Sequence, residues 1–147
     1  MKAKTMALLV VATLFLFLIG CSSSELQYAI EIPYDDFAKV QGTPSRLVAI
    51  CMLVPVGSPF TVTLWSNQTT GFQWSEQAMV EDLNIVQQTD HEFLLPDVKE
   101  TVGAAGKERW TFRALKQGIT TISTEYSQPW KDGQKDDFEF FLTVSVY

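Results

Sequence analysis

Apolar and polar side chains alternate along much of this chain. The alternation is clearest in four segments, at 60–64, 109–114, 122–126 and 138–146. A period of two places one face of a strand against a core and the other toward water. The β-branched and aromatic residues of these segments favour strands, and further strands are predicted at 28–32, 47–53, 72–74, 83–88 and 92–95. The pattern therefore predicts an all-β domain.

Turn signals containing Gly or Pro separate these segments, at 41–44, 55–59, 116–118 and 131–133. Such residues end strands and start turns. About seven or eight short strands with turns at this spacing predict a sandwich of two packed β-sheets. The pattern also predicts one helical turn at 34–40, and it contains no internal repeat. We therefore expect a single domain over residues 28–147.

The start of the chain has the pattern of an export signal. Lys2 and Lys4 precede an apolar run at 6–19, which is shorter than the ~20 residues that a membrane-spanning helix needs. Such a run indicates a secretory signal peptide at 1–20. The sequence Leu-Ile-Gly-Cys ending at Cys21 is similar to a bacterial lipobox, in which the Cys is lipidated and begins the mature chain. The alternative is an ordinary cleavable signal with an incidental Cys.

This pattern predicts an exported lipoprotein of the cell envelope that faces the periplasm or the exterior. An acyl chain on Cys21 would hold it at the membrane, and residues 21–27 would form a polar tether. The formal net charge of the whole chain is −6, and removal of the two lysines makes the domain more acidic. With no basic cluster, this charge argues against a nucleic-acid partner.

The residues that usually carry catalysis are scarce. The remaining thiol, Cys51, lies in the apolar run 47–53, which predicts a buried, unreactive side chain. The only histidine, His91, has acidic neighbours and is predicted in a solvated turn. No Gly-x-Ser-x-Gly elbow is present, and the acidic pairs are not spaced as a calcium loop. We therefore expect a protein that is not an enzyme and that uses no metal or cofactor.

Three loops between strands contain the candidate functional residues. In the first, Asn-Gln-Thr-Thr-Gly-Phe at 67–72, Asn67, Thr69 and Thr70 have side chains that bond to their own backbone and stiffen a turn. Gly71 permits a left-handed conformation before the chain re-enters a strand after Phe72. The alternative is a plain turn that only joins two strands.

The other two loops are chemically different from each other. The second has the sequence Gly103-Ala104-Ala105-Gly106, and its small side chains let the backbone lie close to another surface. A plain flexible hairpin is the alternative. In the third loop, Gln-Pro-Trp at 128–130, Pro129 restricts the backbone before Trp130. Polar neighbours indicate that Trp130 is exposed, and Trp is the residue type most enriched at binding hot spots.

The three loops, in this order, resemble those of the chagasin family of cysteine-protease inhibitors. That family carries an Asn-Pro-Thr-Thr-Gly-Phe loop, a Gly-rich loop and an Arg-Pro-Trp loop on an immunoglobulin-like sandwich. The resemblance covers roughly residues 54–146. It departs from the family pattern at Gln68 in place of Pro, at Gln128 in place of Arg and at Ala105 in place of Gly.

The resemblance implies a protein that blocks the active-site cleft of papain-like cysteine peptidases without a covalent step, and we expect it to be a monomer. Thr69 would reach the catalytic Cys region of the enzyme, supported by Thr70, Gly71 and Phe72. Residues 103–106 would lie along the non-primed side of the cleft, and Trp130 would pack on an aromatic surface of the primed side. The alternative is a lipid-anchored β-sandwich that binds another protein or a carbohydrate at the cell surface. The inhibitor hypothesis requires the three loops to meet at one end of the domain.

Overall fold

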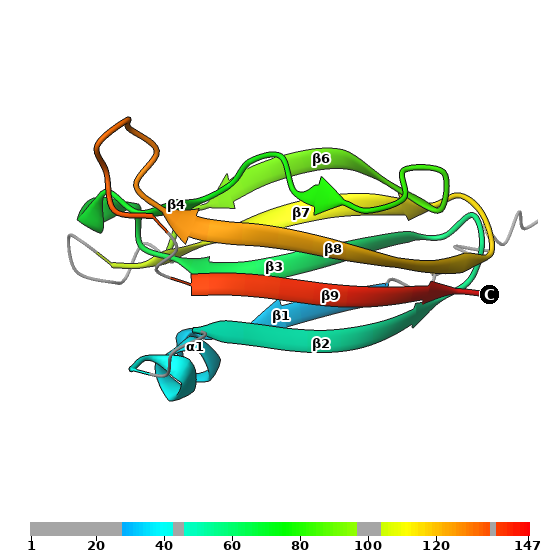
Figure 1. Cartoon of the computed structure of the whole chain (residues 1–147), viewed down its shortest axis with the longest axis horizontal. Coiled ribbons are helices and arrows are strands. Elements are labelled where there is room, and N and C mark those ends of the chain that lie inside the picture. Colours follow the sequence, from blue (N-terminus) through cyan, green and yellow to red (C-terminus); the bar gives the residue numbers. More distant parts are fainter. Residues whose placement is uncertain (1–27, 43–45, 97–103, 136–137) are drawn as a thin grey trace, which may run out of the picture.

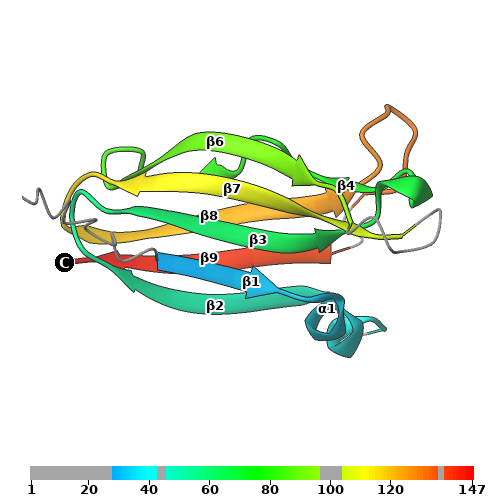
Figure 2. The same ribbon diagram turned by 180° about the vertical axis from the view of Figure 1, so that it is seen from behind.

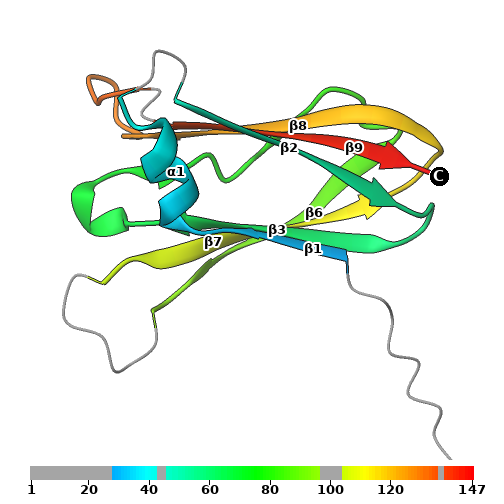
Figure 3. The same ribbon diagram turned by 90° about the horizontal axis from the view of Figure 1, so that it is seen from below.

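Two β-sheets packed face to face form the domain (Figure 1), and Figure 3 shows them as two separate layers. The computed structural model describes residues 28–42, 46–96, 104–135 and 138–147. One sheet has the strand order β1-β3-β7-β6, and the other has the order β2-β9-β8-β4, with β5 also paired to β8. The strands are β1 (Tyr28–Ile32), β2 (Leu47–Val54), β3 (Pro59–Ser66), β4 (Gln73–Trp74), β5 (Met79–Val80), β6 (Val86–Leu94), β7 (Gly106–Ala114), β8 (Gly118–Ser127) and β9 (Phe138–Val146). The prediction of an all-β sandwich is confirmed.

The helical elements are short. The helix α1 (Tyr34–Val40) coincides with the predicted helical turn, and the 3₁₀ turn η1 (Gln68–Thr70) lies between β3 and β4. Phe37 anchors α1 because it is fully buried, with its ring 5.2 Å from that of Trp74 and 5.5 Å from that of Phe138. No helix among the described residues is long and apolar enough to cross a bilayer.

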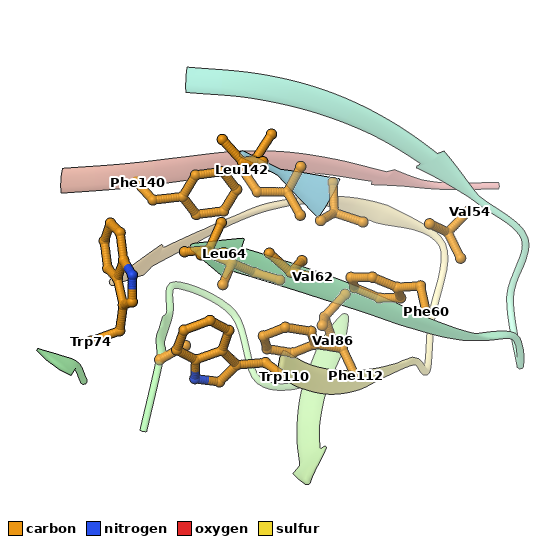
Figure 4. Close-up of a cluster of buried hydrophobic side chains, with 14 of the residues drawn as sticks. Val54, Phe60, Val62, Leu64, Trp74, Val86, Trp110, Phe112, Phe140 and Leu142 are labelled. Atoms are coloured by element: carbon orange, nitrogen blue, oxygen red, sulfur yellow. The ribbon is translucent and has the colours of Figure 1, made fainter. Parts of the chain in front are cut away.

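The core lies between the two sheets and follows the alternation of the sequence. The inward-facing residues of β7 are all buried, whereas those between them are exposed or half-buried. Figure 4 shows the rings of Phe60 and Phe112, whose centroids are 5.2 Å apart, beside Val62, Leu64 and Trp110. Each such side chain contributes about 1.5–3 kcal/mol when it is withdrawn from water. The two sheets are therefore held together by a continuous apolar layer.

One pair of predicted strands is a single strand in the structure. The segments 83–88 and 92–95 were expected to be separate, but β6 runs without a break from Val86 to Leu94. A bulge between Gln88 and Asp90 shifts the register of β6 against β7. The extra residue interrupts the period of two, so one bulged strand has the pattern of two short ones. The two-residue strand β5 was not predicted because it is too short to show a period.

The prediction that Cys51 is buried is wrong. Cys51 is exposed, as are Ala49 and Leu53, on the outer face of β2. β2 lies at the edge of its sheet and pairs with β9 on one side only. Its inner face packs on the core, but in the described residues no layer covers the outer face. In a two-layer sandwich each sheet has one face on the core and one toward solvent, so an apolar run in such a strand does not require burial on both faces. Cys21 and the predicted signal and tether lie outside the described residues.

Candidate functional site

The described parts of the three predicted loops lie at one end of the sandwich, which we call the loop end. The first loop (67–72) follows β3, the second loop (103–106) precedes β7, and the third loop (here extended to 128–135) follows β8. Ser66 at the end of β3 lies opposite Gly106 at the start of β7, and these strands are antiparallel. Figure 1 shows the loop end on the left and the C-terminus at the other end. Gly103 lies outside the described residues.

The first loop is closed by its own side chains. Asn67 Oδ1 accepts hydrogen bonds from the backbone N–H of Thr69 at 3.2 Å and from its hydroxyl at 2.6 Å. The hydroxyl of Thr70 donates to the backbone oxygen of Asn67 at 2.7 Å. Gly71 has φ 80°, the left-handed conformation that its sequence position predicted. Thr69 and Thr70 are exposed at the tip. The first loop is thus a preformed turn.

The buried side chain of Tyr126 holds the start of the first loop through hydrogen bonds. The hydroxyl of Tyr126 accepts a hydrogen bond from the backbone N–H of Asn67 at 3.0 Å and donates to its carbonyl oxygen at 3.2 Å. The Tyr126 ring lies 5.1 Å from that of Trp74 and 5.6 Å from that of Phe72. Burial raises the pKa of Tyr126 above its usual value, so the hydroxyl keeps its proton at neutral pH. The first residue of the loop is therefore fixed to the core.

A buried carboxyl group links the two ends of the first loop. Glu108 is 1% exposed, and its Oε1 accepts hydrogen bonds from the hydroxyl of Ser66 at 2.6 Å and from the backbone N–H of Trp74 at 3.1 Å. Ser66 immediately precedes the loop, and Trp74 follows it by two residues. The other oxygen, Oε2, lies 3.1 Å from Nε2 of His91. Two partners of this carboxyl group, Ser66 and Trp74, thus flank the first loop.

The prediction that His91 lies in a solvated turn is wrong. His91 lies within β6, is half-buried, and has its ring 4.9 Å from that of Trp110. The bulge after Gln88 turns His91 toward the core side, because it shifts the alternation by one residue. The sequence gives no direct signal of this bulge.

Glu108 was missed by sequence reasoning, although a signal for it was present. Trp110 and Phe112 were predicted to face the core, and a period of two places Glu108 on the same face. An acidic residue at a core position is rarely buried without partners. Extension of the alternation by one step toward the N-terminus would therefore have identified Glu108.

In the described part of the second loop, the backbone at Gly106 lies close to β6. A Cβ atom on Gly106 would lie 2.5 Å from the backbone oxygen of Leu94 and 2.5 Å from Cζ of Phe93, so only glycine fits. Ala104 and Ala105 are half-buried. Beside them lies an open hollow of about 360 Å³, lined by residues that include Trp65, Leu94 and Ala105.

The third loop closes on itself. The backbone N–H of Gln128 donates to the oxygen of Gln134 at 2.8 Å, and the side-chain oxygen of Gln128 accepts from the N–H of Gln134 at 2.9 Å. The ammonium group of Lys135 donates to the backbone oxygens of Trp130, at 3.0 Å, and Gln128. Gln128, where the resemblance predicted Arg, is thus an internal brace. Pro129 and Trp130 are exposed at the tip, with 50% of Trp130 accessible.

The first and third loops are in direct contact. A Cβ atom on Gly71 would lie only 2.7 Å from Cη2 of Trp130, so the edge of the indole lies against the bare backbone of Gly71. A Cβ atom on Gly133 would likewise lie 2.9 Å from Nε1 of Trp130. Glycine at these two positions lets the indole lie close to the backbone while half of its surface stays in solvent. The structure therefore brings together two of the three predicted segments.

The described residues of the loop end are suited to binding. The hydroxyl of Ser66 donates to Glu108 and not to His91, and Ser66 is fully buried, so this polar set does not form an accessible nucleophile and base. Within the described ranges, no group of three or more His, Cys, Asp or Glu side chains is placed to hold a metal ion. Among the described residues of this end, the threonine tip and Trp130 are exposed, and Ala104 and Ala105 are half-buried.

Comparison with known proteins identifies the family of this domain. The family model described as chagasin family peptidase inhibitor I42 matches residues 54–144, which is more than half of the chain and includes all three loops. No curated protein matches the chain.

Several solved structures share the fold. A cysteine protease inhibitor, EhICP2, from Entamoeba histolytica has 18% identity and a TM-score of 0.60, and the match covers 83% of this chain and 98% of that chain. PbICP-C, solved in complex with falcipain-2, has 13% identity and a TM-score of 0.58, and the match covers 82% of this chain and 99% of that chain. Amebosin has 19% identity and a TM-score of 0.51, with 82% and 98% covered.

Proposed function

The chain belongs to the chagasin family of peptidase inhibitors, and we propose that it inhibits papain-like cysteine peptidases by inserting its loop end into the active-site cleft. Members of this family are protease inhibitors and not enzymes. The observation that carries the proposal is that the described parts of the three loops lie at one end of the sandwich, where the indole of Trp130 lies against Gly71. The first and third loops, which are separated in sequence, thus form one surface at this end.

Each loop has a proposed place in the complex. Thr69, exposed at the tip of the first loop, would reach the region of the catalytic Cys, and Asn67 would hold that tip through its two hydrogen bonds to Thr69. Thr70, Gly71 and Phe72 would support it. The second loop, Gly103, Ala104, Ala105 and Gly106, would run along the non-primed side. On the primed side Trp130 would pack on an aromatic surface, with Pro129 before it.

Inhibition would not need a covalent bond. The first loop is held by its own side chains and by Tyr126, and the third by Gln128 and Lys135. Ordering a free loop on binding costs about 1–2 kcal/mol per residue for the backbone alone. A surface that is already ordered avoids most of this cost, so more of the contact energy remains as affinity.

A lipid anchor on Cys21 would orient the loop end away from the membrane. β1 is parallel to β3, and Tyr28 at its start lies opposite Phe60, near the start of β3. Since β3 ends at the loop end, the described chain begins at the opposite end (Figure 2). A tether at 21–27 would attach there, in the cell envelope, and leave the loops free to meet a soluble peptidase. Labelling with radioactive palmitate tests the anchor, and Cys21→Ser should abolish the label.

The inhibitor proposal is tested with residues 22–147 against papain, trypsin and thermolysin. We expect inhibition of papain at or below about 1 μM, equivalent to about −8 kcal/mol, and none of the serine or metallo peptidase. Size-exclusion chromatography should show a monomer and a complex with one papain molecule. Absence of papain inhibition at micromolar concentration would overturn the proposal.

A second candidate is a lipid-anchored module that binds another protein or a carbohydrate. The half-exposed indole of Trp130 favours it, because aromatic faces provide large contact area at low entropic cost. Quenching of Trp fluorescence by an oligosaccharide, without papain inhibition, would support this function instead.

A further inference from the structure

We propose that Glu108 is a positioning residue for the first loop, and that its carboxyl group sets the presentation of Thr69 from inside the sandwich. The inference rests on the proposed inhibitor function, because it concerns the loop that would enter the cleft. It assigns a role to a residue that would not touch the peptidase.

Glu108 lies on the core-facing side of β7, where an apolar residue is expected. Its neighbours on the inner face, Trp110 and Phe112, are both 1% exposed and apolar, and Leu64 opposite it on β3 is fully buried. A polar group buried in such a layer is unfavourable unless its hydrogen bonds are satisfied. An apolar side chain there would give a continuous core, so a carboxyl group at this position indicates a task other than packing.

The hydrogen bonds of Glu108 show what that task is. Its Oε1 binds the hydroxyl of Ser66 at one end of the first loop and the N–H of Trp74 at the other. Ser66 belongs to β3 and Trp74 to β4, which lie in different sheets. The first loop therefore crosses from one sheet to the other, and a single oxygen atom ties the two ends of that crossing.

β4 depends on this tie because it is short. It has two residues, paired with Ser127 and Tyr126 of β8. Trp74 donates its backbone N–H to Glu108, so removal of the carboxyl group would leave a buried donor without a partner. The indole of Trp74 would stay bonded to the backbone oxygen of Trp65, but the backbone at the end of the first loop would lose its tie to β7.

His91 orients the carboxyl group. Its Nε2 lies 3.1 Å from Oε2 of Glu108, and its ring packs on Trp110. With Oε2 held from the β6 side, Oε1 points toward the two ends of the loop. The bulge in β6 that turns His91 inward is thereby connected to the shape of the first loop.

The test compares Glu108→Ala and Glu108→Gln with a matched control, Val54→Ala. The amide of Gln can accept the same two hydrogen bonds at Oε1 and can donate to His91, so it should restore the geometry. Val54 is fully buried at the end of the sandwich opposite the loops, so its truncation lowers stability without a contact to the first loop. Two measurements are made on each protein: amide hydrogen exchange at 67–74, and the inhibition constant for papain.

We expect Glu108→Ala to exchange at least about tenfold faster at Trp74 and in the first loop, because it removes the hydrogen bonds to both Ser66 and Trp74. Its inhibition of papain should weaken by at least about tenfold. Glu108→Gln should stay within about threefold of the parent in both measurements. Val54→Ala should unfold more easily but inhibit papain as the parent does. Equal exchange in Glu108→Ala and Val54→Ala, or a Glu108→Gln variant that behaves like Glu108→Ala, would overturn the proposal.

The test also covers a Glu108→Ala variant that does not fold and a parent protein that does not inhibit papain. If Glu108→Ala does not fold, Ser66→Ala replaces it, because that change removes one hydrogen bond and keeps the carboxyl group. Faster exchange at 67–74 in Ser66→Ala supports the proposal, and unchanged exchange overturns it. If the parent protein does not inhibit papain, the proposed function fails, and the exchange measurement alone still decides whether Glu108 positions the loop.

Discussion

The first and third loops lie side by side, but they are held in different ways. The first loop is fixed to the core, by the Tyr126 hydroxyl at its start and by the carboxyl group of Glu108 at both ends. The third loop is closed by its own residues, with the Gln128 side chain and the Lys135 ammonium group bonded to backbone atoms of the same loop. They meet where the indole of Trp130 lies against Gly71.

Because the two loops are held in different ways, we expect substitutions in them to affect inhibition and the free energy of unfolding differently. A substitution of a buried residue that holds the first loop, such as Tyr126 or Glu108, should lower the free energy of unfolding and also weaken inhibition. The same buried groups stabilise the fold and hold the loop. A substitution in the third loop should change inhibition with little effect on unfolding, because its bonds are local and exposed. Gly71 belongs to both cases, since it lies in one loop and contacts the other.

The largest effect on inhibition is expected from Trp130→Ala. Loss of a central indole typically costs about 2–4 kcal/mol of binding energy, which corresponds to a loss of papain inhibition of ~30-fold or more. The free energy of unfolding should change by less than about 0.5 kcal/mol, because the ring is half-exposed. Titration of papain activity and urea unfolding measure the two quantities. Lys131→Ala, an exposed neighbour, is the control, and an equal loss in that variant would contradict a specific role for the indole.

Tyr126→Phe should affect both quantities. It keeps the ring in the core but removes both hydrogen bonds to Asn67, so we expect a loss of about 2 kcal/mol in the free energy of unfolding. Inhibition of papain should weaken in the same variant because the start of the first loop is released. Urea unfolding and inhibition titration are again the measurements. Tyr147→Phe removes a phenol hydrogen bond to Tyr28 at the other end and is the control for inhibition, which should not change. A Tyr126→Phe variant with unaltered inhibition would show that the first loop holds its shape without the Tyr126 hydroxyl.

Gly71→Ala tests the contact between the two loops. A residue other than glycine at φ 80° costs about 1–2 kcal/mol, and the new methyl group would displace the indole of Trp130. Gly57→Ala is a matched control, because Gly57 has φ 84° and no atom within 4 Å of the added Cβ. Both variants should lose similar stability in urea unfolding, and only Gly71→Ala should inhibit papain less well. Equal inhibition by the two would indicate that the contact is unimportant.

Gln128→Ala should give the smallest change among the substitutions. It removes the side-chain hydrogen bond that closes the third loop, worth about 0.5–1.5 kcal/mol. We expect inhibition to weaken by a few-fold at most by the same estimate, with global unfolding unchanged. Gln87→Ala, an exposed change on β6, is the comparison in the same papain assay. A large drop in thermal stability for Gln128→Ala would show that the third loop is coupled to the core after all.

Unfolding at alkaline pH tests the role of the Tyr126 hydroxyl without any change to the exposed loop residues. Burial raises the pKa of Tyr126 in the folded state above its value in the unfolded chain. Below the unfolded value of about 10 the full stabilisation is present, and it is lost as pH rises from there through the folded pKa. The parent protein should therefore lose more stability between neutral pH and pH ~11 than Tyr126→Phe does. Parallel curves for the two proteins, measured by urea unfolding, would contradict this assignment.

Local patterns predicted most of the secondary structure. The alternation at 138–146 and at 109–114 placed β9 and most of β7, and the helical turn at 34–40 coincides with α1. The conformation of the first loop was predicted because Asn67 and Thr70 bond the loop backbone and Gly71 is left-handed, whereas the Thr69 hydroxyl bonds the side chain of Asn67 and not the backbone as expected. Long-range effects caused the errors. The bulge in β6 split one strand into two in the prediction and hid the inward turn of His91.

The sequence alone determined which segments become strands and which turns are rigid, because alternation, glycine conformation and Asn or Thr side chains act over a few residues. It also carried the three motifs that indicate the family. The tertiary structure decided which loops meet, which face of β2 stays uncovered at Cys51, and that Glu108 joins the two ends of the first loop. Each of these outcomes depends on strand order and register, which bring together distant residues such as Asn67 and Tyr126, 59 positions apart. Such pairings depend on the packing of two whole sheets, so no local preference of the chain specifies them.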